Sequence, residues 1–140
     1  MKTKSGIFRV IDANLNRARE GLRVVEDFSR FILEDAALSS RVKKMRHGVD
    51  MLSRKIYPEL ISNRNSAEDV LKKPRETAKK DIKSVLISNI KRVGESLRTL
   101  EEFSKMISPA AGSGFKKIRF EMYDVEKIIA ARISASGVKA

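Results

Sequence analysis

"NLNRAREGLRVVEDFSRFI", residues 14–32, and "NIKRVGESLRTLEEFSKMI", residues 89–107, are two versions of one stretch within a chain of 140 residues. Extended to residues 11–32 and 86–107, the two stretches align over 22 positions without a gap, and nine pairs are identical. Ordinary composition would give about one or two identities by chance. The chain therefore contains an internal repeat, and the repeat preserves charged residues as well as apolar ones.

Residues of both copies recur at the 3.6-residue spacing of one helix face. The two stripes are Ile11, Asn14, Ala18, Gly21, Leu22, Val25, Phe28, Ile32 and Leu86, Asn89, Val93, Ser96, Leu97, Leu100, Phe103, Ile107. We expect helices over about 6–34 and 79–106, the second ended by Pro109 and the glycines of "SPAAGSG". The small residues Gly21 and Ser96 predict a close approach between helices.

The repeat extends beyond these helices. "VKKMRHGVDMLSRKI" (42–56) and "FKKIRFEMYDVEKII" (115–129) share their Lys-Lys pair, an arginine and an isoleucine. The duplicated unit is then a helical hairpin, and two hairpins predict an all-α four-helix bundle with an approximate twofold axis. The expected single domain comprises repeat 1 (about 7–61, with Pro58 ending or kinking its second helix), a linker (62–78), repeat 2 (about 79–134) and a tail (135–140).

Composition excludes several classes of chemistry. The chain has no cysteine and one histidine, His47, so disulfides, cysteine nucleophiles and zinc sites are not expected. No nucleotide-binding glycine motif is present. The N-terminal residues lack the apolar run of a signal peptide, so we expect a cytoplasmic protein without membrane contacts. The net charge of +12 favours an anionic partner, or it is a surplus that serves solubility.

An Asn-x-x-Arg-x-x-Glu unit occurs once in each copy, as Asn14, Arg17, Glu20 and as Asn89, Arg92, Glu95. The amides lie within the apolar stripe, where they are costly unless hydrogen-bonded, and the arginines lie at its edge. Two such units facing each other would suit phosphate recognition, with arginines for the oxygens and carboxylates or amides for a metal ion. The alternatives are surface ion pairs at i,i+3 spacing and small residues that serve packing alone.

The strings "DANLNRAREGLRVVEDFSRF", "RNSAEDV" and "NIKRVGESLRTLEEFSK" together resemble a known family. It is the small helical domain at the N-terminus of some bacterial thiamine-phosphate synthases, which also occurs as a stand-alone hydroxymethylpyrimidine-phosphate kinase. The likeness covers residues 11–129. Because no residues are left over for the barrel of the synthase, the chain looks like the stand-alone form.

This resemblance implies ATP-dependent phosphorylation of 4-amino-5-hydroxymethyl-2-methylpyrimidine phosphate, hereafter the pyrimidine phosphate, to its diphosphate in thiamine synthesis, with Mg²⁺. We assign catalysis to Arg17, Arg92 and Asp69. Substrate binding falls to Asn14, Asn89, Arg46, Arg64 and Arg119, and the metal to Glu20 and Glu95. The motif also covers Arg23 and Arg98.

The linker resembles that of the family at Arg64, Asp69, Val70, Pro74 and Glu76, and departs from it at Asn65 and Leu71, where the family has Asp and Gly. Its length, its polarity and this match predict a lid, in which Arg64 meets phosphate and Asp69 meets the metal or an arginine.

Three other functions use the same features. A basic helical module could bind nucleic acid, although phosphate-backbone contacts do not need the repeated Asn and Glu residues. A helical mutase or lyase could bind a carboxylated substrate through arginines. A non-catalytic bundle could dock onto a thiamine-phosphate synthase. Separately from these functions, the chain could form a homo-oligomer. Binding of ATP distinguishes the kinase from the nucleic-acid-binding and non-catalytic alternatives.

Overall fold

The protein is all-α, as expected. The structure, a computed structural model, describes residues 2–72, 78–79 and 81–136, and all regular elements in these ranges are helical. Four long helices pack together in this part of the chain, and a short helix follows the second; their bounds are α1 Lys2–Asp27, α2 Ala36–Ser53, α3 Tyr57–Asn63, α4 Ile82–Ser104 and α5 Pro109–Ser136.

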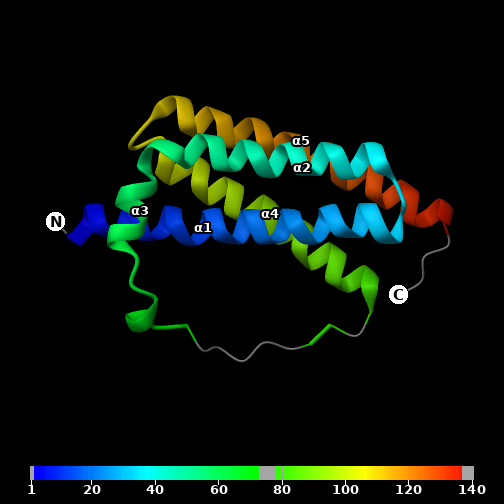
Figure 1. Ribbon diagram of the computed structural model, residues 1–140, viewed down its shortest axis with the longest axis horizontal. Coiled ribbons are helices and arrows are strands. Elements are labelled where there is room, and N and C mark those ends of the chain that lie inside the picture. The colour runs from blue at the N-terminus through cyan, green and yellow to red at the C-terminus, as the bar shows by residue number, and fades with distance from the viewer. Residues whose placement is uncertain (1, 73–77, 80, 137–140) are drawn as a thin grey trace.

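The four long helices form two antiparallel pairs, α1 with α2 and α4 with α5 (Figure 1). In Figure 1, α4 crosses α1 at an angle, and α5 runs beside α2. Buried apolar side chains from all four helices form the core, such as Leu22, Val49, Leu97 and Val125. Among the described residues, no helix is both long enough and apolar enough to cross a membrane.

Gly21 is the point at which α1 and α4 come into close contact. A Cβ atom added at Gly21 would lie 2.7 Å from Cγ2 of Val93 and 3.2 Å from the carbonyl oxygen of Asn89. On α4, the buried Ser96 bends its hydroxyl back onto the carbonyl oxygen of Arg92, at 2.7 Å. The predicted close approach at these small residues is confirmed at Gly21.

The end of α1 differs from the expected uninterrupted helix to residue 34. The chain passes from α1 into a π-helical turn, Phe28–Ile32. A π-turn holds one residue more than an α-helical turn, which shifts the helix face that follows. Leu33 is therefore buried at 7% exposure, and Ile32, which the stripe placed in the core, is 43% exposed. The chain reverses at Glu34 (φ 52°), and Asp35 caps α2.

The segment "SPAAGSG" follows the end of α4, as expected, and from Pro109 on it also begins α5. The helix α4 ends at Ser104, and the turn that follows leaves Ile107 exposed rather than in the core stripe. Pro109 is the first residue of α5, where its missing N–H is no loss. The Ser108 hydroxyl accepts a hydrogen bond from the backbone N–H of Ala111 at 3.2 Å and caps the helix.

The glycines of this segment serve packing inside α5. A Cβ at Gly112 would lie 2.7 Å from Cβ of Lys105, and one at Gly114 would lie 2.5 Å from Cδ2 of Leu52. Close contact with α2 and with the end of α4 thus explains why glycine occupies these two positions inside a helix, although glycine usually indicates a helix end.

The remaining boundaries follow local signals. The helix α2 ends in a 3-10 turn, Arg54–Ile56, and Pro58 lies in the first turn of α3, so the predicted interruption at this proline is confirmed. The helix α4 begins later than expected because Asp81 caps it, accepting a hydrogen bond from the backbone N–H of Ser84 at 2.7 Å. That bond lowers the pKa of the Asp81 carboxyl.

We predict opposite effects of adding one methyl group at two glycines. Gly21→Ala should lower the free energy of unfolding by about 1–3 kcal/mol, because its Cβ overpacks the α1–α4 contact. Gly94→Ala should raise it by about 0.5–1 kcal/mol, because its Cβ meets no atom within 4 Å and alanine favours helix. Urea unfolding followed by circular dichroism measures the free energy of unfolding of each variant. Equal stabilisation by Gly21→Ala and Gly94→Ala would contradict the close α1–α4 contact at Gly21.

Candidate functional site

The α1–α4 crossing holds a groove of about 310 Å³ that joins the two Asn-x-x-Arg-x-x-Glu units. Asn14 and Arg17 line it from α1, and Arg92, Glu95, Ser96 and Thr99 line it from α4. Glu20 and Asn89 are not among the lining residues. The structure therefore brings together four of the six residues of the repeated units, including both arginines.

The two repeated amides are satisfied in the same way. Nδ2 of Asn14 donates to the carbonyl oxygen of Val10, and Nδ2 of Asn89 donates to that of Val85, both at 2.8 Å. Asn14 is only 5% exposed, whereas Asn89 is half-buried. The side-chain oxygen of Asn14, Oδ1, accepts a hydrogen bond from Nη1 of Arg17 at 3.5 Å, so the buried amide helps to orient this arginine.

A second hollow, of about 650 Å³, lies between α1 and the first part of the linker. It shares Asn14 and Arg17 with the α1–α4 groove, and Arg64 and Asp69 line it from the linker. Arg17 thus borders both spaces. A ligand that reaches from one to the other would pass its guanidinium group.

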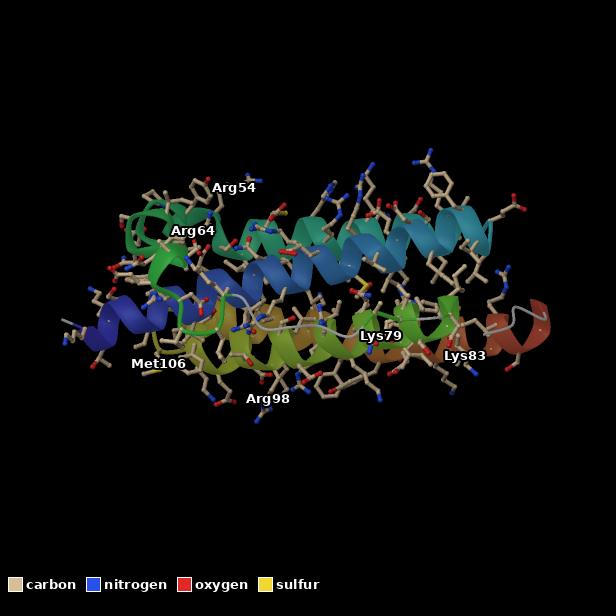
Figure 2. The ribbon with its side chains drawn as sticks, turned by 90° about the horizontal axis from the view of Figure 1, so that it is seen from below. Arg54, Arg64, Lys79, Lys83, Arg98 and Met106 are labelled. Atoms are coloured by element: carbon tan, nitrogen blue, oxygen red, sulfur yellow. The ribbon has the colours of Figure 1, made fainter. Side chains whose placement is uncertain are left out.

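Arg64 is held on α1 by a two-pronged ion pair. Its Nε donates to Oδ2 of Asp12 at 2.7 Å, and its Nη2 donates to Oδ1 at 2.6 Å. These hydrogen bonds raise the pKa of Arg64, and Asp12 is buried. Figure 2 shows Arg64 where the chain leaves α3 and runs alongside α1. This pair fixes the start of the linker.

Asp12 is a site residue that the sequence reasoning missed. A signal was present, because the aligned position in the second copy is the apolar Ile87. A charged residue that appears in only one copy, next to the apolar stripe, points to a partner outside the repeated helices.

Asp69 is exposed, and its Oδ1 accepts a hydrogen bond from the backbone N–H of Leu71 at 2.9 Å. Asn65, one of the two departures from the resembled linker, caps the short turn that follows, because its Oδ1 accepts a hydrogen bond from the backbone N–H of Glu68 at 3.3 Å. Both residues line the linker hollow. Of the other linker matches, Val70 lines this hollow too, and Pro74 and Glu76 lie outside the described residues.

Arg46 and Arg119 each pair with a repeated glutamate of the preceding long helix. Nε of Arg46 lies 3.0 Å from Oε1 of Glu26, and Nη2 of Arg119 lies 2.9 Å from Oε2 of Glu101. Neither arginine lines the Arg17–Arg92 groove. These pairs tie α1 to α2 and α4 to α5, which gives part of the repeated charge a structural role.

The same glutamates also have i,i+3 partners on their own helices, as predicted by the alternative that the repeated charges form surface ion pairs. Nη1 of Arg23 lies 3.4 Å from Glu26, and Nη1 of Arg98 lies 3.9 Å from Glu101. Arg119 donates in addition to the hydroxyl of Tyr123 at 2.9 Å. This bond, and then the bonds to Glu101, raise the pKa of Arg119.

The carboxylates offer limited support for a metal. Within residues 2–72, 78–79 and 81–136, no group of three or more His, Cys, Asp or Glu side chains lies together as metal ligands would. Glu20 and Glu95 are both exposed, but Glu95 lines the groove, whereas Glu20 lines neither space. One carboxylate fits a Mg²⁺ ion that is held mainly by substrate phosphates.

We predict that the Glu26–Arg46 pair contributes to stability. Glu26→Ala should lower the free energy of unfolding by about 1.5–3 kcal/mol, since it leaves a mostly buried arginine without its carboxylate. Arg23→Ala should cost less than about 0.5 kcal/mol, because that side chain is 56% exposed. A double-mutant cycle of Glu26→Ala with Arg46→Ala, read by urea unfolding, should show coupling; additive losses would contradict the pair's role.

Comparison with known proteins places the chain in a family. The ThiD2 family profile matches residues 9–128. A thiamine-phosphate synthase of Nostoc punctiforme is 41% identical over 123 residues, which are 86% of this chain and 34% of that protein. Another, from Synechocystis, is 39% identical over 125 residues, 87% of this chain and 36% of that protein.

The chain thus spans about a third of the length of these curated relatives and corresponds to their N-terminal portion. No solved structure shows a significant match. On the match over residues 9–128, the chain belongs to the ThiD2 family.

Proposed function

We propose that this chain transfers the γ-phosphoryl group of ATP to the pyrimidine phosphate, forming the pyrimidine diphosphate and ADP. The observation that carries the proposal is the placement of Arg17 and Arg92, from two helices, in one groove. Membership of a family whose domain occurs in thiamine-phosphate synthases supports the choice of acceptor.

The chemistry asks mainly for positioning. An oxygen of the acceptor phosphate attacks the γ-phosphorus, a new P–O bond forms, and the bond from the γ-phosphorus to the β-bridging oxygen breaks, releasing ADP. Because the acceptor oxygen is already anionic at neutral pH, no strong base is needed. The obstacle is the repulsion between two anions, and fixed cations that hold both in line reduce it.

Arg17 and Arg92 are suited to that task. A guanidinium group can donate two hydrogen bonds to one phosphate, and a partly enclosed groove strengthens them. Arg17 is oriented by the buried Asn14 and borders both the groove and the linker hollow. In the proposal, Arg92 of α4 binds the phosphates of ATP. Arg17 of α1 binds where the γ-phosphoryl group of ATP meets the acceptor phosphate.

Glu95 is the residue that would hold a Mg²⁺ ion bound with the phosphates. Such an ion would neutralise part of their charge. Glu20 lies outside the groove, so the metal role that the sequence assigned to both glutamates is here proposed for Glu95 alone.

The first part of the linker is proposed as a lid over Arg17. Arg64 is already engaged by Asp12, so its role in this proposal is to anchor the lid rather than to bind phosphate. Asp69 then lies on the same hollow as Arg17, where it could meet a metal ion or an arginine when substrates bind.

The test is formation of the diphosphate from Mg-ATP and the pyrimidine phosphate, followed by mass spectrometry, with kcat/KM compared among variants. Arg17→Ala and Arg92→Ala should each lose charge-assisted hydrogen bonds of about 1.5–3 kcal/mol, a loss of about tenfold to more than hundredfold in kcat/KM. Lysine should rescue only partly, because a point charge does not reproduce a guanidinium fork.

Arg30→Ala is the matched control, an exposed arginine that lines neither space. Its kcat/KM should equal that of the unaltered protein. No diphosphate from the unaltered protein, or near-normal activity in both Arg17→Ala and Arg92→Ala, would refute this assignment.

Asp69→Asn should lower kcat strongly while leaving the free energy of unfolding nearly unchanged. The exposed side chain contributes little to packing, and its Oδ1 bond to Leu71 can be kept by the amide oxygen. Steady-state kinetics and urea unfolding on the same preparation separate the two effects. A linker that only connects α3 to α4 would leave kcat unchanged.

A further inference from the structure

A larger groove, of about 770 Å³, lies on the outer side of α4, between α4 and α5. The buried side chains of Ile90 and Met122 contribute to its floor, and Tyr123, Glu126 and Arg98 contribute to its walls. Its volume falls in the range of small-molecule sites. Glu95 lines both this groove and the Arg17–Arg92 groove, so the two spaces adjoin at this residue.

Two of the differences between the aligned halves of the chain bear directly on this groove. On α1 and α2, the corresponding positions are Arg19 and Asp50, whose Nη1 and Oδ1 atoms pair at 2.7 Å and link the two helices. Arg19 also donates to Oδ1 of Asn16 at 2.6 Å. On α4 and α5, the same positions are Gly94 and Tyr123. A Cβ atom added at Gly94 would meet nothing within 4 Å.

Two of the three cations that line this groove, Arg98 and Arg119, already have carboxylate partners, and the third is Lys91. Arg119 pairs with Glu101 at 2.9 Å, and Arg98 pairs with Glu102 at 3.4 Å. Figure 2 shows Arg98 projecting outward from α4. Glu126 adds a carboxylate to the same lining, which offsets the charge of Lys91.

What remains is a surface for an uncharged aromatic ligand. Ile90 and Met122 provide apolar area, and the ring of Tyr123, 46% exposed, offers a stacking face. The carboxylate of Glu126 can accept hydrogen bonds from amino and hydroxyl groups. A nucleobase with its ribose combines these properties.

We propose that the α4–α5 groove binds the adenosine portion of ATP, with the triphosphate passing Glu95 into the Arg17–Arg92 groove. This inference rests on the proposed function for the identity of the nucleotide. It assigns the nucleotide to the second half of the molecule, because the Arg19–Asp50 pair links the two helices at the corresponding positions in the first half. The pyrimidine phosphate then approaches Arg17 from the linker hollow.

The chain's own first half supplies the test. Gly94→Arg combined with Tyr123→Asp transfers the Arg19–Asp50 pair into the groove without changing the net charge. The control is Ala131→Arg combined with Ala135→Asp, two exposed positions of α5 outside the groove. Titration calorimetry with ADP and Mg²⁺, and separately with the pyrimidine phosphate, measures binding by the unaltered protein and both variants.

The groove variant should bind ADP about ten- to a hundredfold more weakly, the loss expected when a base is deprived of its stacking surface. Its affinity for the pyrimidine phosphate, and the control's affinity for both ligands, should stay within about twofold of the unaltered protein. Unchanged ADP binding by the groove variant, loss of pyrimidine phosphate binding instead, or no ADP binding by the unaltered protein would each overturn the proposal.

These outcomes are separable from those of the proposed function. Diphosphate formation with an unaltered KM for ATP in the groove variant would refute the adenosine site and leave the kinase assignment standing. Weakened ADP binding in the variant, with no diphosphate formed by the unaltered protein, would refute the kinase assignment and leave the adenosine site standing.

Discussion

The contact of α1 with α4 at Gly21 is the constraint on which the rest of this structure depends. With no side chain at this position, Val93 and the backbone of Asn89 lie directly against α1. That approach places Arg17 of one helix and Arg92 of the other on the same groove. A larger residue at Gly21 would separate the helices and with them the two arginines.

Charges that look alike in the two aligned stretches have different roles. The glutamate–arginine pairs Glu26–Arg46 and Glu101–Arg119 link each long helix to the next and belong to the scaffold. Arg17 and Arg92 lie instead where the two halves meet. The proposed chemistry therefore uses the positions at which the halves face each other, and the scaffold uses those within each half.

The two halves also differ where a difference has consequences. Asp12 in the first half, against Ile87 in the second, anchors the linker through Arg64. Gly94 in the second half, against Arg19 in the first, lines the groove between α4 and α5. The aligned arginines Arg17 and Arg92 thus have unlike neighbours, which suits the proposed reaction between two unlike phosphates.

Helical periodicity was enough to predict the all-α fold, the helix pairs and the contact at Gly21, because the spacing of apolar residues is set locally. The π-turn that exchanges Ile32 for Leu33 could not be read from the spacing, since both residues are apolar. The place of the glycines inside α5 could not be read from the sequence, because their reason, contact with Leu52 and Lys105, lies in other parts of the chain.

The placement of both arginines at the candidate site was predictable for the same reason. The spacing indicated that Arg17 and Arg92 occupy equivalent helix edges. Which carboxylate Arg46, Arg64 or Arg119 would meet depends on how helices pack, and no local pattern encodes that choice.

A crystal structure of the protein with the pyrimidine diphosphate bound tests the central claim most directly. The account predicts that both guanidinium groups, of Arg17 and of Arg92, lie within hydrogen-bonding distance of the diphosphate oxygens in the groove between α1 and α4. A diphosphate bound elsewhere on the bundle, with neither arginine in contact, would contradict it.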